Sequence, residues 1–230
     1  MRARQRHLNL RHTGASLVLD SRYINQSDNT AISQWDDRSG NANNASQATA
    51  ANQPTFQTAE CGGNGIVNWD GTNDYLSLAS SVSNVETAVF AGKERQAAPN
   101  DATHFQIQYV AGSNVSAGFF SSFTTESGSV GMFDGTSTRE ANFSSANLRS
   151  VYGIAVANRS SIHINGVEPT YALSSTPNAI SIALIGARTT AFGYCYVDMC
   201  SMCLYTSTLA AALRRRVQNS LAYSFKIACS

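Results

Sequence analysis

Charge is scarce in this chain of 230 residues, because Asp, Glu, Lys and Arg together make up only 13% of it. That is about half of the share usual in globular domains. The net charge is +1, so the chain lacks the strongly basic field that draws a protein onto nucleic acid, and nucleic acid is not expected as a partner. Hydrophobic residues still reach 43%, which is enough for a folded core.

Long apolar runs are missing as well. No stretch is long enough to span a bilayer, and no apolar run follows the basic start as a signal peptide would require. The sequence therefore predicts a soluble chain without a membrane span. Such a chain is either cytosolic at synthesis or exported by another route.

The cysteines form no obvious framework. Their odd number argues against a set of disulfides: Cys61, Cys195, Cys200, Cys203 and Cys229. Cys195, Cys200 and Cys203 have a spacing similar to that of iron–sulfur ligands. However, residues 194–205 are predicted to form a strand, whose side chains alternate between faces, so Cys200 and Cys203 should point to opposite sides. We therefore expect small buried hydrophobic residues rather than metal ligands.

The sequence does not show the residue patterns that glycosidases and nucleophilic hydrolases need. Glycosidases require two carboxylates that flank the scissile bond, yet none of the six glutamates has an acidic neighbour two or four positions away. Two of the four histidines, His7 and His12, lie in the basic N-terminal segment. No nucleophile elbow accompanies His104 or His163. The sequence therefore predicts a protein that is not an enzyme.

Short apolar runs, broken by Gly, Asn, Asp and Ser, fill residues 15–205. Many short strands with turn signals between them are typical of a β-sandwich or barrel. The run 162–167 alternates into Asn165-Gly166, which is a strong hairpin signal. No strand–helix rhythm is present, which argues against a parallel sheet.

One helix is predicted near the end of the chain. An apolar residue recurs there at every fourth position: Leu209, Leu213, Val217 and Leu221. This spacing places the four side chains on one face of a helix. Residues 206–208 offer hydroxyl oxygens that could cap its N-terminus.

The basic residues are concentrated at the start. The first eleven positions hold four arginines and no acidic residue: Arg2, Arg4, Arg6 and Arg11. Two interpretations are open, a terminus without fixed structure or an arm that docks on a partner protein or on phosphates. We expect a basic arm over residues 1–13 that binds other subunits of an assembly. One sandwich domain over residues 14–230 would follow it.

Four stretches stand in a characteristic order. They are residues 32–43 (ISQWDDRSGNAN), residues 52–56 with 67–76 (NQPTF and VNWDGTNDYL), residues 163–168 (HINGVE), and Leu204-Tyr205 with the predicted helix. Together they resemble the laminin-G-like jelly-roll domains of the concanavalin A-like lectin/glucanase superfamily, over about residues 14–228. The resemblance implies an all-β, concanavalin A-like jelly-roll β-sandwich with one short C-terminal helix.

Several positions depart from the family pattern. Leu19 stands where the family has a tryptophan, and Ala210 and Leu213 replace the residues of a capping box. These departures indicate a diverged member, as in viral chains. Trp35 and Trp69 each begin a motif, and we interpret them as core anchors rather than sugar-stacking platforms.

Two of the motif loops are rich in oxygen ligands of the kind that calcium prefers. The candidate set is Asp36, Asp37, Asn41, Asp70, Asn73 and Asp74. The resemblance makes calcium a candidate cofactor, because related sandwiches often carry it. The same side chains also cap turns, and this second interpretation is favoured.

Two functions from different classes follow. The first is a non-catalytic structural or decoration protein of a virus (phage) particle, located in the virion, with a contact to glycans left open. The low charge, the arginine arm and the eroded motifs favour it. The alternative is a carbohydrate-binding, lectin-like module of a surface or secreted protein. The family resemblance and the aromatic residues Tyr109 and Phe119–Phe123 favour this alternative.

Overall fold

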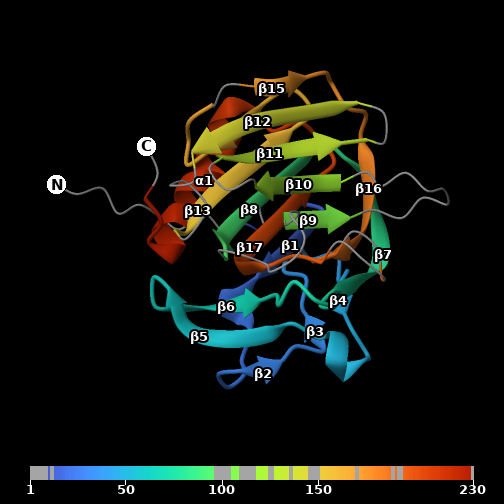
Figure 1. Ribbon diagram of the computed structural model, residues 1–230, viewed down its shortest axis with the longest axis vertical. Helices are drawn as coiled ribbons and strands as arrows, with labels where there is room; N and C mark the ends of the chain where they lie inside the picture. Colours follow the sequence, from blue (N-terminus) through green and yellow to red (C-terminus); the bar gives the residue numbers. More distant parts are fainter. Residues whose placement is uncertain are drawn as a thin grey trace.

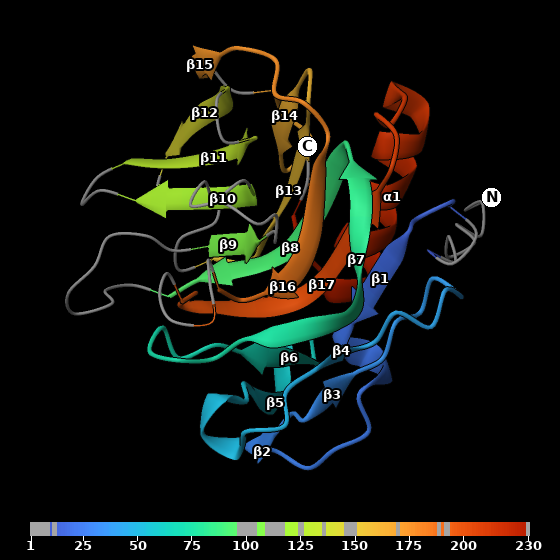
Figure 2. The ribbon, with the colours of Figure 1, turned by 90° about the vertical axis from the view of Figure 1, so that its right-hand side faces the viewer.

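The computed structural model describes residues 10, 13–95, 105–108, 118–123, 127–134, 137–144, 151–168, 171–187, 190 and 194–228. These residues form two antiparallel β-sheets that pack face to face, and helix α1 (Ala211–Phe225) covers the outer face of the first sheet (Figure 1 and Figure 2). The prediction of an all-β sandwich with one short C-terminal helix is therefore confirmed.

The first sheet has the strand order β14-β13-β8-β17-β6-β5-β2, and β1 pairs with the C-terminal part of β17. Its strands are β1 (Leu17–Asp20), β2 (Thr30–Ala31), β5 (Thr55–Cys61), β6 (Asn64–Asn68), β8 (Thr87–Glu94), β13 (Gly153–Asn158), β14 (Ile162–Ile164) and β17 (Val197–Tyr205).

The second sheet has the strand order β15-β12-β11-β10-β9-β16-β7-β4-β3. Its strands are β3 (Gln34–Trp35), β4 (Ala45–Ser46), β7 (Leu76–Val85), β9 (Phe105–Gln108), β10 (Gly118–Phe123), β11 (Ser127–Phe133), β12 (Thr138–Ser144), β15 (Tyr171–Ser174) and β16 (Ile180–Ile185). Two short 3₁₀ turns, η2 (Ser21–Tyr23) and η3 (Ala50–Asn52), lie in the loops before β2 and β5.

Strands β13 and β17 of the first sheet are buried on both faces, because the second sheet covers one side and α1 covers the other. In β8, Phe90 faces the core between the sheets, whereas Val89 faces a second core under the helix. Every described residue of β17 is buried for the same reason. Trp35 and Trp69 are buried in the core between the sheets, so their predicted role as core anchors is confirmed.

Cys200 and Cys203 do not lie on opposite faces as strict alternation predicts. Both belong to the core under α1. The reason is a β-bulge, because the pairing of β17 with β8 shifts register between Met199 and Ser201 and one extra residue enters the strand. The predicted orientation was therefore wrong. The prediction that these cysteines are buried is confirmed.

The predicted hairpin turn is present, but the predicted cap of the helix is not. Asn165 and Gly166 have φ angles of 50° and 92°, and they join β14 to Val167 in the predicted tight turn. Helix α1 begins after Ala210, where no side chain caps it. The cap predicted from residues 206–208 is wrong, because the hydroxyl of Thr208 donates to Glu86 Oε2 at 2.9 Å instead.

The described part of the N-terminal segment is packed against the sandwich. Leu10 is buried in the core under α1. The hydroxyl of Thr13 donates to the carbonyl of Leu10 at 2.7 Å, and it shares a hydrogen bond of 3.0 Å with the phenol of Tyr205. The four arginines of the predicted arm, Arg2, Arg4, Arg6 and Arg11, lie outside the described residues.

Within the part of the chain that the structure describes, no helix combines the length and the apolar character needed to cross a membrane.

Candidate functional site

A small polar pocket lies where the turn η2 meets strand β3. Eight residues line it: Asp20, Tyr23, Ile24, Asn25, Gln26, Gln34, Trp35 and Asp36. Its volume is about 130 Å³, below the roughly 300–1,000 Å³ of sites that enclose drug-sized ligands. The lining combines carboxylates and amides with two aromatic rings.

Two polar atoms of the pocket residues have no hydrogen-bond partner among the described residues. Trp35 is only 1% exposed, and its indole Nε1–H is an unpaired donor. Gln26 Oε1 is an unpaired, buried acceptor. Buried polar groups are nearly always paired, so each unpaired atom needs an explanation. Trp69 Nε1 is unpaired too, but Trp69 does not line the pocket.

The carboxylates of the pocket differ in their surroundings. Asp36 is exposed, and its Oδ1 accepts a hydrogen bond of 2.7 Å from Gln34 Nε2. Asp20 is buried and forms an ion pair with Arg22, with Nη2 at 2.5 Å from Oδ2. Asp20 thus has a cation to balance its charge, and Asp36 has no ion pair among the described residues.

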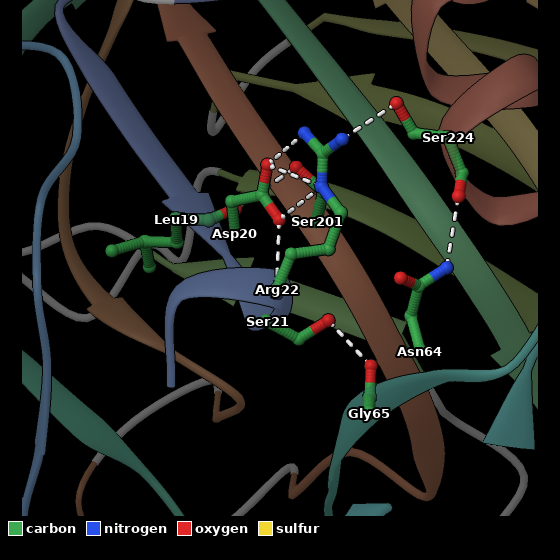
Figure 3. Close-up of polar contacts among 8 residues, drawn as sticks. All are labelled: Leu19, Asp20, Ser21, Arg22, Asn64, Gly65, Ser201 and Ser224. Carbon is green, nitrogen blue, oxygen red and sulfur yellow. Dashed lines mark hydrogen bonds and ion pairs between the residues drawn. The ribbon is translucent and has the colours of Figure 1, made fainter. Parts of the chain in front are cut away.

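Arg22 connects the pocket to the C-terminal helix (Figure 3). Its Nε also donates to Asp20 Oδ1 at 3.0 Å, and its Nη1 donates to Ser224 Oγ in α1 at 2.6 Å. Burial opposes the charge of Arg22, but the hydrogen bond and the charge of Asp20 outweigh it and raise the pKa of Arg22. The residue is therefore a fixed cation rather than a mobile surface side chain.

Further hydrogen bonds hold this corner of the fold in place. Ser21 Oγ donates to the carbonyl of Gly65 at 2.5 Å, and Asn64 Nδ2 donates to the carbonyl of Ser224 at 2.8 Å (Figure 3). Strands β1 and β17 are joined similarly, because Ser201 Oγ donates to the carbonyl of Leu19 at 2.9 Å. These hydrogen bonds tie η2, beside the pocket, to strand β6 and join β1 to β17.

Tyr23 forms the rim of the pocket. It is 55% exposed. The guanidinium of Arg38 lies 4.5 Å from the centre of its ring, and that of Arg22 lies 5.8 Å away. Cation–π contacts of this kind orient an exposed ring at a modest gain in free energy. An aromatic side chain is thus held in place at the mouth of a polar pocket.

In the first predicted calcium loop, the carboxylate of Asp37 accepts hydrogen bonds from backbone N–H groups. Asp37 Oδ1 accepts from the backbone N–H groups of Val18 and Ser39, at 3.0 and 2.8 Å. Asp37 Oδ2 accepts from Ser39 Oγ at 2.7 Å and from the backbone N–H of Asn43 at 3.1 Å. These bonds are those of a turn-capping aspartate. Asn41 lies in the same loop, and its Nδ2 donates to the carbonyl of Ser16 at 2.9 Å.

The second loop has a similar arrangement. Asp70 Oδ1 accepts from the backbone N–H groups of Thr72 and Asn73, at 2.7 and 3.3 Å. Asp74 Oδ2 accepts from the backbone N–H of Asp70 at 2.9 Å. Burial raises the pKa of Asp74 to about 6, and the nearby charge of Asp70 adds to this effect although the backbone hydrogen bond opposes it.

Among the described side chains, no three His, Cys, Asp or Glu residues cluster closely enough to hold a metal ion. Amide and carbonyl oxygens can also bind calcium, so calcium at the six predicted residues stays a prediction. Of these six, Asp36 lines the pocket.

Of the eight residues that line the pocket, the sequence analysis singled out Trp35 and Asp36; the other six, Tyr23 among them, were not singled out. A signal for Tyr23 exists, because it is an aromatic residue in a polar segment that follows a buried strand. Of the aromatic residues expected to serve a glycan, Tyr109 lies outside the described residues. Phe119–Phe123 belong to β10 in the second sheet, away from the residues that line the pocket.

Comparison with known proteins gives a likeness in fold alone. No protein-family model and no curated protein matches the sequence. Among solved structures, the chain is similar to a Trypanosoma rangeli sialidase in complex with 2,3-difluorosialic acid (TM-score 0.58, 13% identity, 94% of this chain and 34% of the sialidase). It is also similar to the binding domain of botulinum neurotoxin serotype D (TM-score 0.57, 11% identity, 90% of this chain and 52% of that domain).

These likenesses cover almost the whole of this chain but only part of each similar structure. The chain spans about a third of the length of the sialidases and about half of the toxin binding domain. At such low identity they support the β-sandwich fold, and they transfer no residue role to this chain.

Proposed function

We propose that this chain is a non-catalytic carbohydrate-binding module of a surface or secreted protein, and that it is a diverged member of the concanavalin A-like superfamily. The observation that carries the proposal is the pocket at η2 and β3, where the oriented ring of Tyr23 at the rim lies beside carboxylate and amide side chains. The fold likeness to a sialidase and to the binding domain of a neurotoxin is consistent with it.

The chemistry of the pocket suits a sugar. A sugar residue presents several hydroxyl groups, each of which can donate and accept a hydrogen bond. Asp36, Gln34 and Asn25 offer acceptors and donors at the wall, and Tyr23 offers an amphipathic ring at the rim. A few convergent polar groups beside an aromatic ring are the usual composition of a small-molecule site.

A glycan array, followed by calorimetry with the best ligand, tests the proposal. The informative variant is Tyr23→Ala, which removes the rim of the pocket. Its matched control is Tyr223→Ala, because Tyr223 in α1 is similarly exposed at 59% and does not line the pocket. We expect glycan binding by the wild-type chain and by Tyr223→Ala, and a loss of at least about ten-fold in affinity for Tyr23→Ala, or about 1.4 kcal/mol.

Two results would sink the proposal. One is the absence of binding to every glycan on the array. The other is binding that Tyr23→Ala and Tyr223→Ala weaken equally, since the pocket would then not be the site. Cleavage of a bound glycan would instead contradict the non-catalytic part of the proposal.

A structural role in a virus particle is the other function that the sequence suggests. It depends on the basic arm, whose arginines lie outside the described residues, and the structural likenesses give it no support. Light scattering after size-exclusion chromatography tests it, with the full chain and a chain lacking residues 1–9. This truncation spares Leu10 and Thr13, which are packed against the sandwich. Oligomers that require the arm would favour the virion role.

A further inference from the structure

We infer that the outer face of the first sheet holds a second binding surface, beyond the part that α1 covers, and that this surface takes a carboxylate or sulfate group of an acidic polysaccharide. Six side chains form this surface, which we call the cation surface: Asn68, Lys93, Arg95, Tyr152, Tyr196 and Asp198. None of them lines the pocket at η2 and β3, so the inference goes beyond the function proposed for that pocket.

Strand alternation places the cation surface on the same face of the sheet as α1. Ala91 of β8 belongs to the core under the helix, and Lys93 and Arg95 follow it at steps of two residues. Asp198 of β17 pairs with Lys93, and Asn68 of β6 pairs with Asp198. Three strands of the first sheet thus bring these side chains together at one end of its outer face.

Lys93 is held in place from two sides. Its Nζ lies 3.0 Å from Asp198 Oδ2 and 4.6 Å from the centre of the Tyr152 ring. Its side chain is still 22% exposed. The ion pair and the cation–π contact therefore fix the direction of the ammonium group without enclosing it.

Arg95 is held in a similar way. Its guanidinium lies 4.7 Å from the centre of the Tyr196 ring, and its Nη1 donates to Asn68 Oδ1 at 3.2 Å. Its Nε lies 3.8 Å from Asp198 Oδ1, and its side chain is 35% exposed. Two cations that are ordered before a ligand arrives lower the entropic cost of binding it.

Positive charge is in excess at the cation surface. Asp198 is buried and accepts a hydrogen bond of 2.7 Å from Asn68 Nδ2, and it is the only ion-pair partner of Lys93 and Arg95 among the described residues. One carboxylate thus offsets two cations. In the described part of the chain, Arg95 Nη2 donates to no residue, so donors remain for an outside acceptor.

The remaining donors and the surplus charge suit an oxyanion. A guanidinium matches the geometry of a carboxylate or sulfate group, and an ammonium adds a point charge beside it. Nucleic acid and anionic bilayers are held by several cations at once, which a surplus of one charge does not supply. A polysaccharide that carries about one acidic group on each ring presents such groups singly, and it is the ligand that this surface fits.

The test titrates four probes by calorimetry at low ionic strength. Trigalacturonate carries a carboxylate on every ring, and galactotriose is its neutral counterpart. A heparin-derived tetrasaccharide supplies sulfate groups, and a tetraglutamate peptide supplies carboxylates that no sugar carries. The informative variants are Arg95→Gln and Asp198→Asn. The matched control is Arg159→Gln, because Arg159 is 31% exposed, is also ion-paired, and lies at the opposite end of β8.

We expect at least one acidic saccharide to bind at least about ten-fold more tightly than galactotriose. Arg95→Gln should weaken this binding by about ten-fold, because a charge-assisted hydrogen bond is lost, whereas Arg159→Gln should leave it unchanged. Asp198→Asn can keep its bond from Asn68 and raises the surplus charge, so it should strengthen binding at least about three-fold. A merely structural role of Asp198 would not strengthen binding. Thermal unfolding checks that each variant is folded, and Lys93→Gln, which should weaken binding, replaces Asp198→Asn if that variant unfolds.

Four results would overturn the inference. They are equal affinity for trigalacturonate, the heparin fragment and galactotriose, equal weakening by Arg95→Gln and Arg159→Gln, weaker binding by a folded Asp198→Asn, and tetraglutamate binding as tight as that of the acidic saccharides. The pocket is tested separately, because Tyr23→Ala should leave acidic saccharides unaffected. Their loss in Tyr23→Ala would place them in the pocket, which would overturn this inference and leave the proposed function standing.

Discussion

Arg22 folds back onto the carboxylate of Asp20, two residues before it, with Nε at 3.0 Å from Oδ1 and Nη2 at 2.5 Å from Oδ2. The remaining Nη1 reaches Ser224 in α1, 202 positions further along the chain. The ring of Phe225 lies 5.2 Å beneath the guanidinium. One residue thus joins the first strand, the rim of the pocket and the end of the last helix.

Removal of the Asp20 charge should therefore destabilise the fold as well as the pocket. In Asp20→Asn, Arg22 keeps its partly buried charge without a counterion, and we expect a loss of about 2–4 kcal/mol in the free energy of unfolding. Denaturant titration measures it. Glu86→Gln is the comparison, because the Arg159–Glu86 pair is longer, at 3.3 Å, and more exposed. That variant should lose less than about 1 kcal/mol. Equal losses would show that Asp20 has no special role.

His163 should make stability depend on pH. It is buried in β14, and neither ring nitrogen has a hydrogen-bond partner in the described part of the chain. Burial lowers its pKa, with the charge of Arg214 adding to the effect and that of Glu168 opposing it. The folded state thus binds a proton less readily than the unfolded chain, whose histidine titrates near about 6.5. Stability that is present above this pH should be lost as the pH falls below it.

The variant His163→Leu isolates this contribution, since leucine has no proton to bind. The measured quantity is the difference in unfolding free energy between the variant and the wild-type chain. We expect the wild-type chain to lose stability relative to the variant between about pH 7 and about pH 5. A difference that stays constant over this range would contradict the buried, neutral state of His163.

Asp74 should make stability depend on pH in the opposite direction. Its pKa is raised to about 6, so the folded state favours the protonated side chain. The stability that protonation provides is full below the unfolded value of about 3.9 and is lost as the pH rises through about 6. Asp74→Asn should therefore be more stable than the wild-type chain by about 3 kcal/mol near neutral pH and nearly equal to it near about pH 4.

The same loop tests the calcium prediction. A bound cation would stabilise the ionised carboxylates of Asp70 and Asp74 and would raise the melting temperature by mass action. The turn-capping geometry predicts melting temperatures in millimolar calcium and in EDTA that agree within about 1 °C. A larger rise in calcium that is absent in Asp74→Asn would establish a calcium site here.

The cysteines of the core under α1 should not react with alkylating reagents in the folded protein. Cys61, Cys200 and Cys203 are fully buried, and burial raises the pKa of Cys200 and of Cys203, so little thiolate forms. Alkylation read by peptide mass spectrometry should leave these three and Cys195 unmodified until denaturant is added. Rapid labelling of Cys200 or Cys203 without denaturant would contradict the packing of α1 on the first sheet.

Local patterns in the sequence were sufficient for much of this fold. The hairpin at Asn165-Gly166 is predictable because its two residues adopt positive φ angles that few other pairs tolerate. The strands that the apolar pattern indicates, such as residues 130–133 and 180–185, are present because alternation with a period of two is a local property. Strand β5 was not predicted, because polar residues separate its buried Phe56 from Cys61 and the apolar alternation is lost.

Tertiary structure decided the features that depend on pairing between distant segments. The bulge at Met199–Ser201 turns Cys200 and Cys203 to the same face. No residue type in this segment predicts the bulge. The pocket exists because the turn after β1 meets β3, and Arg22 is held there by a helix at the other end of the chain. The sequence by itself determined a β-sandwich with a C-terminal helix. Which polar side chains would meet in a pocket depended on long-range contacts, which leave no local periodicity in the sequence.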